Sequence, residues 1–146
     1  MSEPEQQAAI QPEIIQALIA VRDRAYTPYS QHPVGAMVIS ESGTRYTGAN
    51  VEVAHYKGLC AEASALAAMA SAGERRLREV YVIGPGEHLC TPCGDCRQRI
   101  REFASPETLI RVVDADGKLL RRYHMDDLLP DSFGPENLGR DSAMAD

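Results

Sequence analysis

The sequence lacks the features that mark membrane proteins and non-specific nucleic-acid binders. No run of about eighteen apolar residues occurs, so we expect no membrane-spanning helix. The 15 Lys and Arg residues are outnumbered by 21 Asp and Glu residues, which gives a formal net charge of −6. That sign is opposite to the basic surface of a protein that binds nucleic acid. The composition therefore predicts that neither a membrane nor a nucleic acid is the partner.

The N-terminus and the cysteine content indicate where the protein acts. The start of the chain, Met-Ser-Glu-Pro-Glu-Gln-Gln, has neither the positive region nor the apolar core of a signal peptide. The chain has only four cysteines, and without a secretory signal these fit a reducing compartment and a metal site better than disulfides. We therefore expect a cytoplasmic protein.

Length and hydrophobic pattern predict one α/β domain. The 146 residues, 44% of them apolar, suffice for a single domain over 1–146, with flexible ends at about 1–10 and 139–146. Helical and strand periodicities alternate along the chain. The predicted helices cover residues 12–24, 60–72 and 93–103, and the predicted strands cover 34–40, 44–49, 80–83, 109–113 and 118–123, followed by a short helical turn at 126–129. This order predicts a layered sheet that is antiparallel at the first hairpin and parallel across a helical crossover.

Two short motifs at the starts of two predicted helices carry the chemistry. They are Cys60-Ala61-Glu62 and Pro92-Cys93-Gly94-Asp95-Cys96. Three thiolates, from Cys60, Cys93 and Cys96, fill three positions of a tetrahedral zinc site and leave the fourth for water, as in catalytic zinc sites. Glu62 follows a ligand by two residues, so it lies beside the metal and exchanges protons with the water and a leaving group. The motifs predict one Zn²⁺ per chain and Glu62 as the catalytic residue.

Cys90 leaves a second interpretation open. Cys90, Cys93 and Cys96 also have the spacing of metal ligands, so a closed site of four cysteines is the alternative. The protein would then be a zinc-stabilised interaction module without turnover. A structural site of that kind has no use for an acid at position 62. We favour the hydrolytic site and interpret Cys90 as a buried thiol.

The two motifs together resemble the signature of zinc nucleobase deaminases, with Cys60 in place of a histidine. Over about residues 12–138 the chain is similar to the nucleoside-type cytidine deaminases. The similar segments are 25–30, 33–36, 48–52, 93–98, 128–130 and 133–138. The resemblance implies a three-layer α/β/α fold with a five-stranded mixed sheet. It also implies a homotetramer whose subunits share active sites.

The resemblance also implies which residues contact the substrate. Asn50 and Glu52 match the Asn and Glu that hold the ribose hydroxyls, and their donors and acceptors suit that role. Phe133 matches the Phe that reaches a neighbouring subunit's substrate, and Ala61 lies beside the catalytic acid. From the residues alone, Asn50 and Glu52 are equally well explained as turn residues, and Phe133 as part of its own subunit's core.

The chain departs from the family's pattern around the pocket. His32 stands where the family usually has a Phe against the pyrimidine. The stretch from Asn50 to Cys60 is one residue shorter, and Val53 and His55 replace the residues usual after the sugar-binding Glu. We expect a roomier and more polar pocket wall at His32.

A further departure concerns charge. Ala63 replaces an Arg that usually follows the catalytic Glu. Three thiolates and one Zn²⁺ leave a net negative charge, which makes the bound water a weaker acid. Arg97 is the nearest candidate in sequence to offset that charge, together with the amides at the helix N-termini. The short loop and the missing Arg also resemble blasticidin S deaminases, whereas Glu52 argues against that group.

We therefore predict zinc-dependent hydrolytic deamination of cytidine or deoxycytidine to uridine or deoxyuridine, with release of ammonia. A deaminase of a modified cytosine nucleoside or of a blasticidin-like antibiotic is the alternative.

Overall fold

The computed structural model describes residues 10–145. A five-stranded sheet occupies its centre in the order β2-β1-β3-β4-β5. The strands are β1 (Gly35–Ser40), β2 (Arg45–Ala49), β3 (Leu77–Ile83), β4 (Leu109–Val113) and β5 (Leu119–His124). The helices are α2 (Pro12–Arg22), α3 (Ala61–Ser71), α4 (Gly94–Phe103) and the short α5 (Met125–Leu128), followed by 3₁₀ turns at Pro135–Leu138 and Ala143–Ala145.

Strand directions agree with the mixed sheet that the sequence predicts. The hairpin strands β1 and β2 are antiparallel, as are β1 with β3 and β4 with β5. Strands β3 and β4 are parallel and are joined through α4, because parallel neighbours need a crossover connection. The predicted α/β class and five-stranded mixed sheet are confirmed.

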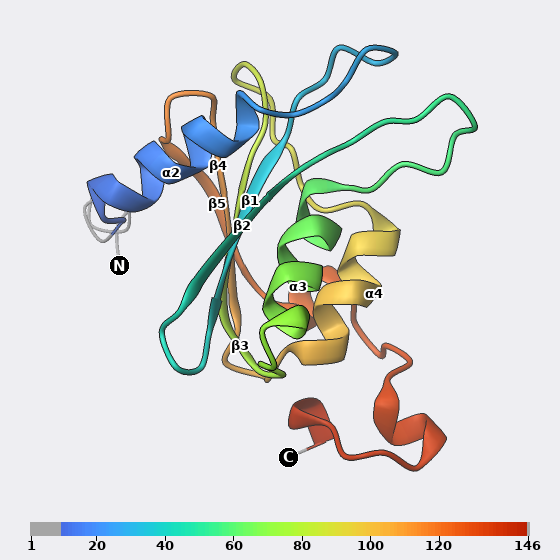
Figure 1. The fold of residues 1–146 in the computed structure, drawn as a ribbon. Helices are drawn as coiled ribbons and strands as arrows, with labels where there is room; N and C mark the ends of the chain where they lie inside the picture. The colour runs from blue at the N-terminus through green and yellow to red at the C-terminus, as the bar shows by residue number, and fades with distance from the viewer. Residues whose placement is uncertain (1–9, 146) are drawn as a thin grey trace.

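Helices cover both faces of the sheet and make three layers (Figure 1). One core lies between the sheet and α2 and includes Leu18, Met37 and Ile83. The second core lies between the sheet and the α3–α4 layer, and Leu66 and Ile100 belong to it. Every residue of β1 is buried, because the strand is covered on both faces and paired on both edges.

The helix α3 packs closely on the sheet because its side chains are small. Its sequence is AEASALAAMAS, and it contacts β2 and β1. A Cβ added to Gly48 of β2 would lie 2.4 Å from the backbone nitrogen of Ala65 and 2.7 Å from the carbonyl oxygen of Ala61. Glycine at this position therefore fixes the distance of α3 from the sheet. Since α3 begins directly after Cys60, the same contact fixes the depth of the site.

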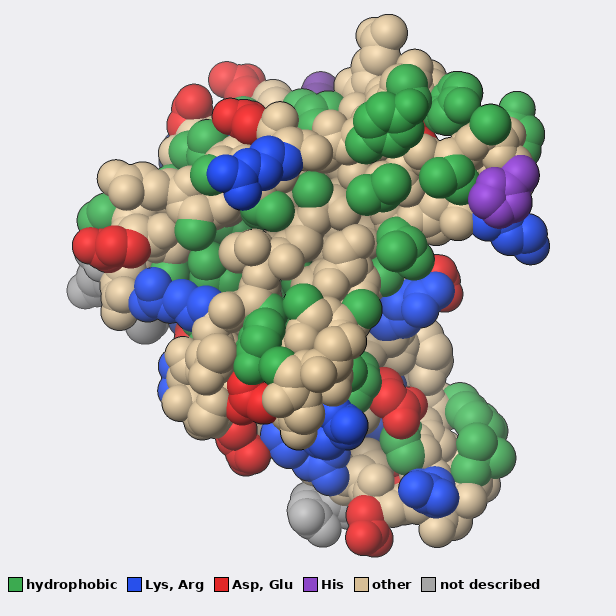
Figure 2. All heavy atoms as spheres, in the orientation of Figure 1, with side chains coloured by type: hydrophobic (Ala, Val, Ile, Leu, Met, Phe, Trp, Pro, Cys, Tyr) green, Lys and Arg blue, Asp and Glu red, His purple; other side chains and the backbone are tan. Residues whose placement is uncertain are grey.

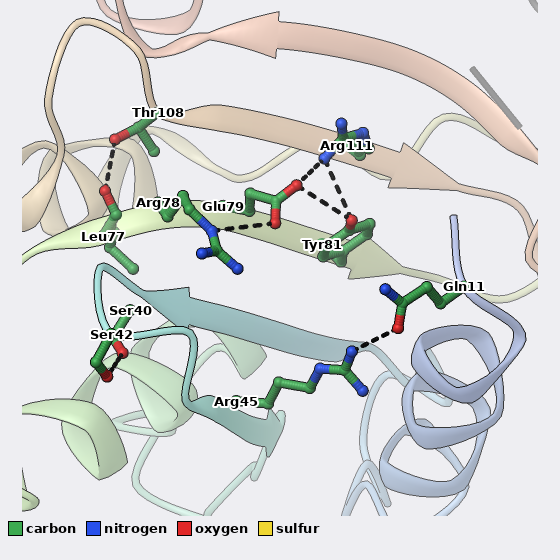
Figure 3. Close-up of polar contacts among 10 residues, drawn as sticks. All are labelled: Gln11, Ser40, Ser42, Arg45, Leu77, Arg78, Glu79, Tyr81, Thr108 and Arg111. Atoms are coloured by element: carbon green, nitrogen blue, oxygen red, sulfur yellow. Dashed lines mark hydrogen bonds and ion pairs between the residues drawn. The ribbon is translucent and has the colours of Figure 1, made fainter. Parts of the chain in front are cut away.

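A polar cluster lies on the α2 side of β3 and β4 (Figure 3). Glu79 and Tyr81 are alternate residues of β3, so their side chains point to the same face. Arg111 of β4 donates to both of them and lies over the Tyr81 ring, 5.4 Å from its centroid. Tyr81 belongs to the core on the α2 side, and the Arg111–Glu79 ion pair lies next to it.

Element boundaries differ from the predicted ones by a few residues. Strand β3 begins at Leu77 rather than at residue 80, because Arg78 and Glu79 continue the alternation with polar side chains. Helix α2 ends at Arg22, two residues early. The flexibility expected at 1–10 and 139–146 stays a prediction: residues 1–9 and 146 lie outside the described part, and Ile10 and Ser142 are buried. Among the described helices, none has the length and apolarity needed to cross a membrane.

Candidate active site

The N-termini of α3 and α4 meet beside the same cavity. Cys60 is the N-cap of α3 and Cys93 is the N-cap of α4, both with extended backbone. Cys96 lies in the first turn of α4 and is fully buried. Backbone N–H groups at helix N-termini favour negative charge, so the two helix N-termini suit a cluster of anionic metal ligands.

The three thiols are arranged as a metal centre. Their Sγ atoms all lie within 4.8 Å of one another, and those of Cys60 and Cys93 are 3.8 Å apart. Zinc–sulfur bonds of about 2.3 Å in tetrahedral geometry place neighbouring sulfurs about 3.8 Å apart. The cluster therefore fits a zinc site with three thiolate ligands.

Burial and mutual proximity make the thiolate forms costly in the absence of a cation. Desolvation raises the pKa of the Cys96 thiol, and the neighbouring Glu62 and Cys60 raise it further. Desolvation likewise raises the pKa of Cys60. A divalent cation supplies the positive charge that these groups lack, so its binding releases protons and weakens as pH falls.

Glu62 is placed next to this cluster by the turn that begins α3. Its side chain is 4% exposed and lines the cavity together with Cys60 and Cys93. Desolvation raises the pKa of the Glu62 carboxyl above its usual value. A carboxyl group shifted in this direction both accepts and donates protons more readily near neutral pH.

The cavity beside the thiols has a volume of about 320 Å³. It brings together the predicted substrate residues His32, Asn50, Glu52 and Ala61 with the metal cluster. Phe133 does not line it within this single chain. The sequence analysis missed six further lining residues, namely Val34, Val51, Gly58, Leu59, Cys90 and Thr91. Their only sequence signal is that each stands within three positions of a predicted site residue.

Asn50 and Glu52 hold the loop that forms one wall of the cavity. The Asn50 Oδ1 atom accepts a hydrogen bond from the Val34 amide (2.8 Å), and Nδ2 donates to the His32 carbonyl (2.9 Å). Glu52 accepts from the backbone amides of Tyr29 (3.1 Å) and Ser30 (3.0 Å) and from the Ser30 hydroxyl. These bonds, chiefly those from Ser30, lower the pKa of Glu52. Both side chains therefore have a structural task besides the predicted contact with the sugar.

His32 points from that loop toward Cys90 across the cavity wall. Its Nε2 atom lies 3.7 Å from the Cys90 Sγ. Cys90 is partly exposed rather than the buried thiol predicted, because it lines the cavity. Desolvation and the nearby Glu62 raise the pKa of Cys90 to about 11, so the thiol is neutral at physiological pH. The pair gives the cavity a polar wall.

Arg97 makes hydrogen bonds to the backbone. Its Nε donates to the Pro92 carbonyl (2.8 Å), and Nη1 donates to the Leu128 carbonyl (3.0 Å). These bonds fasten the strand-to-helix loop before Cys93 to the end of α5. They direct two of the guanidinium nitrogens to carbonyls rather than to the thiols. Arg97 therefore makes these hydrogen bonds to carbonyls, and the two helix N-termini are a second source of positive potential beside the thiols.

Comparison with known proteins agrees with this geometry. The model of the cytidine and deoxycytidylate deaminase zinc-binding region matches residues 9–112. The chain is 36% identical over 118 residues to a cytidine deaminase of Sporosarcina psychrophila, an alignment that covers 80% of this chain and 86% of that protein. It is 37% identical over 118 residues to the cytidine deaminase of Mycobacterium tuberculosis, covering 80% and 84%.

Solved structures of similar proteins share the fold. The crystal structure of cytidine deaminase from Burkholderia pseudomallei superposes with a TM-score of 0.77 at 35% sequence identity, covering 85% of this chain and all of that one. The cytidine deaminase of Mycobacterium tuberculosis superposes with a TM-score of 0.73 at 34% identity, covering 86% and 98%. The thiol cluster, the fold and these similarities agree: the chain belongs to the cytidine and deoxycytidylate deaminase zinc-binding family.

Proposed function

We propose that this protein hydrolyses the exocyclic C–N bond of cytidine or deoxycytidine, giving uridine or deoxyuridine and ammonia. The observation that carries the proposal is the position of Glu62, buried in the first turn of α3 beside three thiols and facing a cavity. A zinc-stabilised module without turnover would not require a buried acid there, because removing a carboxylate from water is unfavourable.

The three cysteines and Glu62 have different roles in the reaction. Cys60, Cys93 and Cys96 would hold Zn²⁺. When bound, the metal lowers the pKa of a water molecule and so generates a nucleophile. Glu62 takes a proton from the attacking water and delivers it to N3 of the base as the oxygen adds at C4. It then takes the remaining proton from the new C4 hydroxyl and passes it to the departing amino group, so that ammonia leaves and a C4 carbonyl remains. The raised pKa of the carboxyl suits this two-way transfer.

The remaining cavity residues position the nucleoside. Asn50 and Glu52 line the cavity, and their remaining lone pairs and the second Asn50 N–H group suit ribose hydroxyls. Ala61 has a small side chain next to Glu62, which leaves room for the base to approach the reacting atoms. His32 contacts the base from the opposite loop.

The protein acts as a homotetramer with shared active sites, in which Phe133 closes a neighbour's cavity. Phe133 is 58% exposed, so its ring is available to a partner subunit. Hydrophobic side chains also gather at the upper right of Figure 2, in the region of the loops before β1 and α3. These two loops carry the exposed aromatic side chains of Tyr26, Tyr29 and Tyr56. The setting is cytoplasmic nucleoside metabolism, namely pyrimidine salvage.

One observation favours a second substrate class. The polar pair of His32 and Cys90 stands on the wall that would contact the base, and it offers hydrogen-bonding groups to a ring substituent. A modified cytosine nucleoside, or a blasticidin-like antibiotic, is therefore the alternative substrate.

A panel assay tests the proposal. Purified zinc-loaded protein is incubated with cytidine, deoxycytidine, ring-substituted cytidines, N4-substituted cytidines and blasticidin S, and ammonia and the deaminated product are quantified. Turnover of cytidine or deoxycytidine with the highest kcat/KM supports the main proposal, and preference for a modified compound supports the alternative. Absence of turnover on every compound by a zinc-loaded, folded protein would contradict both. Sedimentation of the same preparation gives the assembly state, for which we expect a tetramer.

A further inference from the structure

The segment 130–142 leaves the sheet after α5 and lies next to the C-terminal end of α4 (Figure 1). Its regular structure is a single 3₁₀ turn at Pro135–Leu138. Two of its apolar side chains are exposed, Phe133 at 58% and Leu138 at 71%. A segment with so little structure of its own needs outside contacts to hold an aromatic side chain in one place.

Arg101 of α4 supplies those contacts at three points along the segment. Its Nε donates to the Ser132 hydroxyl (2.7 Å), both Nη atoms reach the Glu136 carboxylate, and Nη1 donates to the Ser142 hydroxyl (3.3 Å). Arg101 is only 3% exposed. A buried guanidinium is costly unless its donors are satisfied, and here they are satisfied by residues of the segment.

The backbone of the segment is also fitted to α4. A Cβ added to Gly134 would lie 2.4 Å from the Arg101 Cζ atom, so a side chain at this position would have to displace the guanidinium or the segment. One turn earlier on the same face of the helix, Gln98 Nε2 donates to the Phe133 carbonyl (2.9 Å). The backbone of Phe133 is thus positioned by the hydrogen bond to its carbonyl and by the packing of Gly134 on Arg101.

The same helix begins at the metal cluster. Cys93 caps α4 and Cys96 lies in its first turn, while Gln98 and Arg101 follow on the next two turns. We propose that Arg101 is a positioning residue for deamination: by fastening segment 130–142 to α4, it sets where Phe133 is presented to the neighbouring subunit's cavity. This inference rests on the proposed function, because it takes Phe133 to act in that cavity.

Both partners of the Arg101–Glu136 pair are ionised at neutral pH. The hydrogen bond from Arg101 lowers the pKa of the Glu136 carboxyl to about 2, so the carboxylate stays ionised at neutral pH. The positioning therefore does not depend on pH near neutrality.

The chain contains a matched control for Arg101. Arg111 pairs with Glu79 in a similar setting: the side chains of Arg101 and Glu136 are 4% and 31% exposed, and those of Arg111 and Glu79 are 11% and 20% exposed. Arg111 lies in β4, on the α2 side of the sheet (Figure 3). Arg111→Lys disturbs a comparable ion pair away from the segment that carries Phe133.

The test measures kcat, KM and zinc content for Arg101→Lys, Gly134→Ala, Phe133→Ala, Arg111→Lys and the double variant Arg101→Lys/Phe133→Ala. We expect KM for cytidine to rise about tenfold in Phe133→Ala, the effect of losing one base–aromatic contact. Arg101→Lys and Gly134→Ala should raise KM in the same direction while zinc content and kcat stay near wild type. Arg111→Lys should leave KM unchanged.

The double variant decides whether Arg101 acts through Phe133. If it does, the double variant is no worse than Phe133→Ala alone, because the two changes remove the same contact. Additive effects, or an unchanged KM in Arg101→Lys and Gly134→Ala, would overturn the positioning role while leaving the proposed function intact. An unchanged KM in Phe133→Ala would instead show that the proposed placement of Phe133 is wrong, and Arg101 would then have nothing to position.

Discussion

The Sγ atoms of Cys60 and Cys93 lie 3.8 Å apart, although the residues are separated by 33 positions in the chain. Each caps a different helix, and the sheet holds the two helices side by side. The spacing is that of two sulfurs on one tetrahedral zinc ion. The fold thus assembles a metal centre from two segments that are far apart in sequence, and Cys90 lies outside the cluster.

Replacing the cysteines one at a time separates the open site from a closed four-cysteine site. We expect Cys93→Ser to lose zinc, because two thiolates hold the ion much more weakly than three. Cys90→Ser should keep close to one zinc per chain, since the Cys90 thiol is paired with His32 rather than with the cluster. Metal analysis after dialysis checks both variants, and the reverse pattern would support the structural site.

The close packing of α3 on β2 makes Gly48 critical for the site. In Gly48→Ala the new Cβ meets backbone atoms of α3, which cannot move independently of the helix. We expect a loss of about 1–3 kcal/mol in the free energy of unfolding and weaker zinc binding, as α3 carries Cys60 and Glu62 away from α4. Gly94→Ala is the control, because a Cβ there meets nothing within 4 Å. The urea unfolding midpoints of Gly48→Ala and Gly94→Ala test this expectation, and equal midpoints would contradict the packing argument.

Acid should abolish the stability that Glu136 provides. Its pKa is lowered from 4.5 to about 2 in the folded protein, chiefly by Arg101. Because folding lowers the pKa of this carboxyl, the ionised Glu136 stabilises the folded protein at pH values above its unfolded pKa. That stabilisation is lost as the pH falls from the unfolded pKa toward the folded pKa. Glu136→Gln should therefore lower the urea midpoint near neutral pH and lose that effect as pH falls from 4.5 to about 2. A difference between the two proteins that is independent of pH would refute this assignment.

Much of the fold was readable from the sequence because local signals and tertiary contacts agree. The apolar run of β1 and the alanine-rich α3 are buried as their composition predicts. The two cysteine motifs mark helix starts that converge, so the metal cluster followed from type and spacing. The start of β3 could not be predicted from the sequence, because the charged residues Arg78 and Glu79 are typical of a loop. They continue the strand because Arg111 of the neighbouring strand pairs with Glu79.

Contacts between distant segments are the part that the sequence could not provide. Nothing near Arg101 in the chain indicates that its guanidinium binds Ser132, Glu136 and Ser142. Likewise, the side chain of Asn50 looks free for a ligand until the loop at Val34 is seen to bond to it. The packing of the layers determines these contacts, and short sequence motifs do not predict them.

The polar wall of the cavity should control the choice among cytosines. In His32→Phe the imidazole that lies 3.7 Å from Cys90 is replaced by a larger apolar ring. We expect kcat/KM for ring-substituted cytidines to fall about tenfold relative to cytidine, since pocket contacts discriminate by about 1–3 kcal/mol. Cys90→Ala removes the partner without adding bulk and should shift the ratio in the same direction by less. An unchanged ratio in His32→Phe would show that His32 does not select the base.

The role of Glu62 is the central claim, and Glu62→Gln tests it most directly because the amide keeps the shape of the side chain and removes its acidity. Zinc content and kcat for cytidine are measured on the same preparation of wild type and variant. The account predicts close to one zinc per chain in both proteins and a kcat lowered by about 10²–10⁴-fold in the variant. Loss of zinc together with activity, or a variant that retains wild-type turnover, would contradict it.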